Sequence, residues 1–187
     1  MKQRPILFSG PMVTAIIEGR KTQTRRLVKS RSYITDYENG IVFEMTEDGS
    51  QPINCPYGIE LDRLWVRETW GREYGGGFLY RASHSHMKPD GGWKPSIHMP
   101  RTVSRINLEV QSIRVERLQD ITREDALSEG VYYDQRLDGY VTDKDGRNFH
   151  HSDPRISFCK LWVAINGGES WDANPYVWVV QFKQSQN

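Results

Sequence analysis

The segment Asp62–Trp70 carries the strongest β-strand signal in the chain, because it is dense in β-branched and aromatic residues. Side chains alternate between the two faces of a strand, so Glu68 shares a face with Leu64 and Val66. A carboxylate on an apolar face either pairs with a cation or lines a cavity, since an unpaired buried charge is costly. Glu68 is therefore a candidate acid or base, with a structural ion pair to an arginine as the alternative.

The other elements expected from the sequence are short strands separated by single helices. The expected strands are Pro5–Phe8, Ser104–Leu118 and Val177–Phe182, and the expected helices are Met12–Glu18, Asp120–Glu129 and Phe158–Ile165. A switch of the apolar face near Ile113 predicts a bulge in the long strand. The pattern Thr122-x-x-Asp125, a variant of the capping box, predicts the start of the second of these helices. Strands and helices do not alternate as in a parallel βαβ fold. The sequence therefore predicts an α+β fold, a small mixed or antiparallel barrel with peripheral helices.

Composition limits the possible partners. The chain has 187 residues and a formal net charge of +1, which favours one domain and gives no bulk field for binding a long nucleic acid. Its two cysteines, Cys55 and Cys159, lack metal-ligand spacing, and no apolar run is long enough to span a membrane. We expect residues 1–187 to form a single domain of a cytoplasmic protein that binds no metal and no cofactor.

The stretch Gly19–Arg26 is the densest in chemistry, with four cations, two hydroxyls and no apolar side chain. It follows the first predicted helix, and Gly19 is suited to end that helix. Such a segment suits binding an anion or activating a hydroxyl. Lys21 and Thr24 are three residues apart, so in a regular strand they point to opposite faces. They converge only if Lys21 still lies in the turn after Gly19, or if a bulge intervenes.

The pattern Gly19-x-Lys21-x-x-Thr24-x-Arg26 resembles the first motif of the ASCH domain family, in the PUA-like superfamily. Many members carry Glu where this chain has Thr24, but the members that hydrolyse N4-acetylcytidine carry Gly-Arg-Lys-Thr-x-Thr-x-Arg, which this chain reproduces. The segment Asp62-x-Leu-Trp-Val resembles the second family motif, with Leu61 in place of its usual glycine. The chain looks most like the longer ASCH proteins of phages and prophages.

The resemblance implies a PUA-like barrel with a cleft for a nucleoside or RNA, and insertions at about 30–59 and 132–154. It also implies a catalytic trio of Lys21 as base, Thr24 as nucleophile and Glu129 as the orienting carboxylate. Glu129 is matched by its position near the end of a helix, and Glu68 competes with it for the carboxylate role. The implied reaction is hydrolysis of N4-acylated cytidine.

Further candidates for substrate binding lie around this trio. They are Arg20, Thr22, Arg26, Arg67 and Trp70. Two other functions stay open, namely a non-catalytic module that binds RNA or a modified base and a metal-independent ribonuclease acting in the same cleft. In a purely structural alternative, Lys21, Arg25 and Arg26 form a solvated basic face.

Overall fold

The computed structural model describes residues 1–29, 34–38, 41–46, 49–142 and 150–185. A five-stranded sheet forms its centre, and the strands lie in the order β1, β6, β10, β13, β2. Their bounds are Gln3–Leu7 for β1, Arg63–Arg67 for β6, Asn107–Arg117 for β10, Tyr176–Ser185 for β13 and Gln23–Leu27 for β2. The pair β1 and β6 is parallel, and the other pairs are antiparallel. The predicted bulge is confirmed, because the register of β10 against β13 shifts between Val110 and Ser112.

Helix α1 (Gly10–Ile17) packs its apolar side onto this sheet. Val13 and Ile16 are buried in the main core together with Leu64, Val66 and Trp178 of the strands. Pro11 occupies the first turn, where its missing N–H costs nothing, and Gly19 ends the segment with a φ of 73°. The end of α1 is thereby fixed beside the start of β2.

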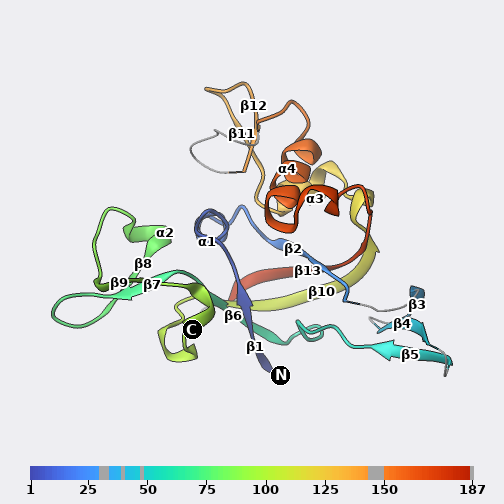
Figure 1. The fold of residues 1–187 in the computed structure, drawn as a ribbon, viewed down its shortest axis with the longest axis horizontal. Helices are drawn as coiled ribbons and strands as arrows, with labels where there is room; N and C mark the ends of the chain where they lie inside the picture. The colour runs from blue at the N-terminus through green and yellow to red at the C-terminus, as the bar shows by residue number, and fades with distance from the viewer. Residues whose placement is uncertain (30–33, 39–40, 47–48, 143–149, 186–187) are drawn as a thin grey trace.

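Two further helices form a second apolar cluster at one end of the sheet. Helix α3 (Arg123–Ser128) begins with the predicted capping box, in which Thr122 and Asp125 bond each other's backbone N–H. Helix α4 (Pro154–Asn166) buries Phe158 and Trp162 against it. In Figure 1, α1 lies between these two helices and the strands β7 to β9.

Three smaller sheets surround the central one. The first joins β7 (Trp70–Arg72), β8 (Phe78–Tyr80) and β9 (Asp90–Lys94), next to the short helix α2 (Arg81–His84). The two segments expected as insertions hold the others: β3 (Ile34–Glu38), β4 (Ile41–Thr46) and β5 (Gly49–Ile53), and β11 (Tyr132–Asp134) with β12 (Gly139–Val141). Short 3₁₀ turns lie at Ser96–His98, Arg101–Val103, Leu118–Asp120 and Gly168–Ser170.

The α+β class is confirmed, with mostly antiparallel strands and few helices. The expected closed barrel is not found in the described part of the chain, where β1 and β2 are the two edges of the sheet. One side-chain hydrogen bond crosses between these edges, from Arg26 Nη2 to the carbonyl of Leu7 at 2.6 Å. None of the described helices is long and apolar enough to cross a membrane.

Candidate active site

Lys21 and Glu129 form a buried ion pair at the centre of the candidate site. Their side chains are 1% and 4% exposed, and Lys21 Nζ lies 2.8 Å from Glu129 Oε2. Nζ also donates to the backbone carbonyls of Glu129 and Gln23, each at 2.8 Å. An ammonium has three N–H groups, so these bonds use all of its donors.

The backbone leaves regular strand geometry at Lys21. Its N–H still donates to the carbonyl of Ala15 in α1, so Lys21 belongs to the turn after Gly19. Lys21 then forms an isolated bridge with Glu129, and β2 begins only at Gln23. This is the departure that the spacing of Lys21 and Thr24 requires if both are to reach one site.

Burial lowers the pKa of Lys21 from its usual value, and the nearby charges of Arg26 and Arg25 act in the same direction. Glu129 opposes this shift by its charge and its hydrogen bond. A lysine whose pKa is lowered can lose its proton and act as a base.

Arg25 fixes the other side of Glu129. Its side chain is fully buried, and Nη1 lies 3.3 Å from Glu129 Oε1. Nη2 donates to Asp125 at 2.9 Å and to Glu116 on β10. Asp125 and Glu129 are four residues apart and face the same side of α3, so one guanidinium binds both. The solvated basic face is therefore wrong for Lys21 and Arg25, because carboxylates from α3 and β10 surround them.

This network extends to the surface through Arg114, which donates to Asp125 at 2.9 Å and to Glu116 at 3.0 Å. Burial alone would raise the pKa of Asp125, but the charge of Arg25 and the hydrogen bonds from Gln23 and Arg114 lower it to about 2. Asp125 is therefore ionised at neutral pH and pairs with Arg25 as an anion.

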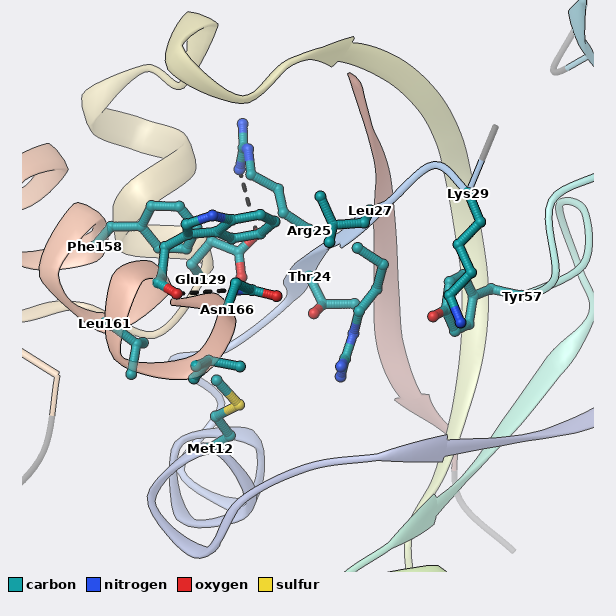
Figure 2. A pocket seen from close by; sticks show the side chains of 13 residues that line it. Met12, Thr24, Arg25, Leu27, Lys29, Tyr57, Glu129, Phe158, Leu161 and Asn166 are labelled. Atoms are coloured by element: carbon teal, nitrogen blue, oxygen red, sulfur yellow. Dashed lines mark hydrogen bonds and ion pairs between the residues drawn. The ribbon is translucent and has the colours of Figure 1, made fainter. Parts of the chain in front are cut away.

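Thr24 and Glu129 both line a cavity of about 180 Å³, hereafter the Thr24 cavity. In Figure 2, Phe158 and Leu161 of α4 lie on one side of it, and Thr24 lies across from them on β2. The remaining lining residues are Met12, Arg25, Arg26, Leu27, Lys29, Tyr57, Trp162, Ile165 and Asn166. The Thr24 hydroxyl makes no hydrogen bond to Lys21, whose donors go to Gln23 and Glu129.

Three residues that line this cavity each hold a buried donor without a partner in the described part of the chain. Arg25 Nε, Arg26 Nε and Trp162 Nε1 are buried and bond to no acceptor among the described residues. A buried donor left unpaired costs about 1–3 kcal/mol, so such groups are uncommon in folded proteins. A cavity wall that holds such residues suits a ligand rich in acceptors, such as one with a carbonyl group.

Glu68 lies in a different place, where it lines a second and larger cavity. Its carboxylate is 2% exposed and accepts two hydrogen bonds from Arg105, at 2.8 and 3.0 Å. The Arg105 guanidinium in turn lies over the ring of Tyr80. Both readings of the sequence are thus realised, because Glu68 is paired and also lines a cavity. It does not contact Lys21, and Glu129 is the carboxylate that does.

The other predicted binding residues do not form one set. Arg26 lines the Thr24 cavity, whereas Arg20 lines the larger cavity and bonds Glu18 and the carbonyl of Gly130. The remaining candidates line neither of these cavities. Thr22 is exposed, Arg67 donates to the backbone of Met99 and Ile97, and Trp70 is buried against Met99 and Val103.

Asp125 and Glu116 belong to the site but were not predicted from the sequence. Asp125 was identified only as a helix cap, although its spacing of four residues from Glu129 places both on one helix face. Arg114 and Glu116 are two residues apart in β10 and therefore share one face of the strand. This spacing could have indicated that the two side chains act together. Nothing local pointed to Arg105 as the partner of Glu68.

In the described residues, no group of three or more His, Cys, Asp or Glu side chains is arranged to hold a metal ion. Comparison of the chain with protein-family models, with curated proteins and with solved structures found no match.

Proposed function

We propose that the chain is a hydrolase of an N4-acylated cytosine nucleoside, with Thr24 as nucleophile, Lys21 as base and Glu129 as the residue that orients Lys21. We also retain the PUA-like ASCH fold as part of this proposal, because the motif Gly19–Arg26 supplies the site. The observation that carries the proposal is that Glu129, which forms a buried ion pair with Lys21, lines the same cavity as Thr24.

The reaction begins with neutral Lys21. A neutral amine has two N–H groups and one lone pair, so deprotonation releases one of its three acceptor contacts. The Gln23 carbonyl belongs to the peptide bond that leads into Thr24, so a small shift of Nζ exchanges this carbonyl for the Thr24 hydroxyl. Lys21 and Arg25 each contact one oxygen of the Glu129 carboxylate, so Glu129 holds its place when Nζ shifts.

Thr24 Oγ then bonds to the acyl carbon as its proton passes to Lys21 Nζ. The oxygen of the former carbonyl becomes an oxyanion, for which the unpaired N–H groups of Arg26 and Trp162 are suitable donors. As the carbon–nitrogen bond breaks, Lys21 returns its proton to the N4 amine that leaves. Water next hydrolyses the acyl ester of Thr24, again with Lys21 as base, and releases the acid.

The size and walls of the Thr24 cavity limit the substrate. Its volume of about 180 Å³ is below the several hundred Å³ of a pocket that encloses a whole drug-sized ligand. We assign it to the base and acyl group, between Phe158, Trp162 and Met12. The ribose would lie outside, towards Lys29 and Tyr57.

The test is incubation of N4-acetylcytidine with a high concentration of the protein, followed by chromatographic detection of cytidine. We expect cytidine to form in the wild type. We also expect the rate to rise with pH as Lys21 loses its proton, because only the neutral amine is a base. The Lys21→Gln variant should release no cytidine, whereas the matched control Lys88→Gln, at an exposed lysine outside the cavity, should keep the wild-type rate. Absence of cytidine with the wild type would refute the proposal.

Binding without turnover is the second candidate function. The observation in its favour is that Lys21 uses all three donors in a closed ion pair, as a purely structural lysine does. RNA would then be held by Arg26 and Lys29, since the buried Arg25 cannot contact a phosphate. This candidate predicts that N4-acetylcytidine or RNA binds and is recovered intact.

A further inference from the structure

The larger cavity, of about 650 Å³, is lined by residues at the start of α1, and we call it the α1 cavity. It is lined by Ser9, Gly10, Pro11, Thr14, Arg20, Glu68, Thr69, Arg81, Ala82, Ser85 and Thr142. Its volume falls within the range of about 300–1,000 Å³ that is usual for small-molecule sites. The lining combines two arginines with hydroxyl groups and one carboxylate.

The start of α1 opens into this cavity. The Ser9 hydroxyl does not cap the helix, and no acidic side chain lies in the first turn. The backbone N–H of Gly10 has no acceptor in the described part of the chain, and Pro11 has no N–H. The positive end of the helix dipole therefore faces the cavity without a counter-charge, which favours an anion there.

The charged side chains around the cavity also favour an anion. Glu68 is neutralised by its double hydrogen bond to Arg105, and Arg20 is balanced by Glu18. Arg81 is exposed and forms no ion pair with the described residues, which leaves one uncompensated cation beside the helix end. A phosphate group accepts hydrogen bonds from a guanidinium and from backbone N–H groups.

Thr142 gives a separate indication of a ligand. It is 9% exposed and lines the cavity, yet its hydroxyl bonds to no described residue. The hydroxyl of this nearly buried residue is therefore available to bond a molecule in the cavity. Glu68 adds an acceptor, because each of its oxygens keeps a lone pair after binding Arg105. The ligand therefore combines an anionic group with an N–H or O–H donor.

We propose that the α1 cavity binds a mononucleotide, with the phosphate at Arg81 and the N-terminus of α1 and a hydroxyl or amine donor at Glu68. A nucleotide has both groups within one molecule, and its size suits the cavity. The choice of a nucleotide over other phosphate esters rests on the proposed function. The anion site itself rests on the geometry of this cavity alone.

The experiment is isothermal titration calorimetry of the full chain with cytidine 5′-monophosphate, cytidine and inorganic phosphate. We expect the monophosphate to bind at least about tenfold more tightly than cytidine, as a charge-assisted contact implies. Inorganic phosphate should compete with it. The Arg81→Gln variant should lose about tenfold in affinity for the monophosphate and keep its affinity for cytidine. Arg72→Gln is the matched control, because Arg72 is exposed and lies outside the cavity.

Equal affinity for the monophosphate and cytidine would overturn the proposal, and so would an Arg81→Gln variant that binds both ligands as the wild type does. Thr142→Val is a second test, since it removes only the free hydroxyl and should weaken the monophosphate alone. If inorganic phosphate binds as tightly as the nucleotide, the cavity is an anion site, and the proposal that its ligand is a nucleotide is refuted. A Thr24→Val variant separates this site from the proposed hydrolysis, because it should bind the monophosphate normally.

Discussion

Removal of each partner of the buried ion pair should have different consequences, which can be worked out from the contacts. Lys21 has one carboxylate partner, Glu129, whereas Glu129 has both Lys21 and Arg25. In the Lys21→Met variant, Glu129 keeps a charged partner, and the methionine preserves most of the aliphatic packing. In the Glu129→Gln variant, Lys21 keeps only neutral acceptors. We therefore expect Glu129→Gln to be the more destabilising change.

The cost of Glu129→Gln has an upper limit, because an unpaired buried lysine loses its proton. Deprotonation costs about 1.4 kcal/mol for each pH unit below the unperturbed pKa of about 10.4, hence at most about 5 kcal/mol at pH 7 and about 2 kcal/mol at pH 9. The folded-state pKa of Lys21 then lies below its unfolded value, so the unfolded state binds more protons and stability rises with pH. Lys21→Met removes the charged hydrogen bond to Glu129 and two bonds to backbone carbonyls, so we expect a cost of about 2–3 kcal/mol at pH 7. This cost should grow with pH, because the variant lacks the lysine whose lowered pKa makes the wild type more stable at higher pH.

Urea unfolding of the wild type and the two variants at pH 7 and pH 9 measures these free energies. The cost of Glu129→Gln relative to the wild type should shrink between pH 7 and pH 9, whereas the cost of Lys21→Met should not shrink. Equal costs of the two variants at pH 7 would refute this prediction, and so would a cost of Glu129→Gln that does not change with pH.

Three further predictions concern stability and reactivity. The pKa of Asp125 is lowered to about 2 in the folded state, so its contribution of about 2 kcal/mol should be lost as the pH falls from about 4 to 2. Acid unfolding of Asp125→Asn should lack this part of the pH dependence, and an unchanged profile would contradict it. Gly130 has a φ of 101°, and an added Cβ would lie 3.3 Å from Lys21 Cβ. The Gly130→Ala variant should therefore have an unfolding free energy lower by about 1–3 kcal/mol, as measured by urea titration. Burial raises the pKa of Cys55 to about 11, so iodoacetamide at pH 8 should label the partly exposed Cys159 first. Peptide mass mapping measures the order of labelling, and faster labelling of Cys55 would be inconsistent with its burial.

Local patterns in the sequence predicted the parts of the fold that depend on neighbouring residues. The capping box of α3 and the bulge of β10 both follow from short-range chemistry, and both are present. The geometric condition on Lys21 and Thr24 came from the alternation of side chains along a strand, and the turn after Gly19 meets it.

Contacts between distant segments could not be predicted in the same way. Arg25 lies in a run of cations that suggests a solvated face, but Glu116 and Asp125 are about ninety to one hundred residues away and bury it. The pairing of Glu68 with Arg105 likewise depends on where two distant loops meet. The sequence thus indicated which residues carry charge, whereas the fold decides which of them are paired.

The central claim is that the Thr24 hydroxyl is the nucleophile of an amide hydrolysis. The most direct measurement compares single-turnover release of cytidine from N4-acetylcytidine by the wild type, Thr24→Ser and Thr24→Val. Serine keeps a hydroxyl, whereas valine has nearly the same shape as threonine without one. We predict activity within about tenfold of the wild type for Thr24→Ser and a loss of at least about a thousandfold for Thr24→Val. Release of cytidine by Thr24→Val at the wild-type rate would contradict the account.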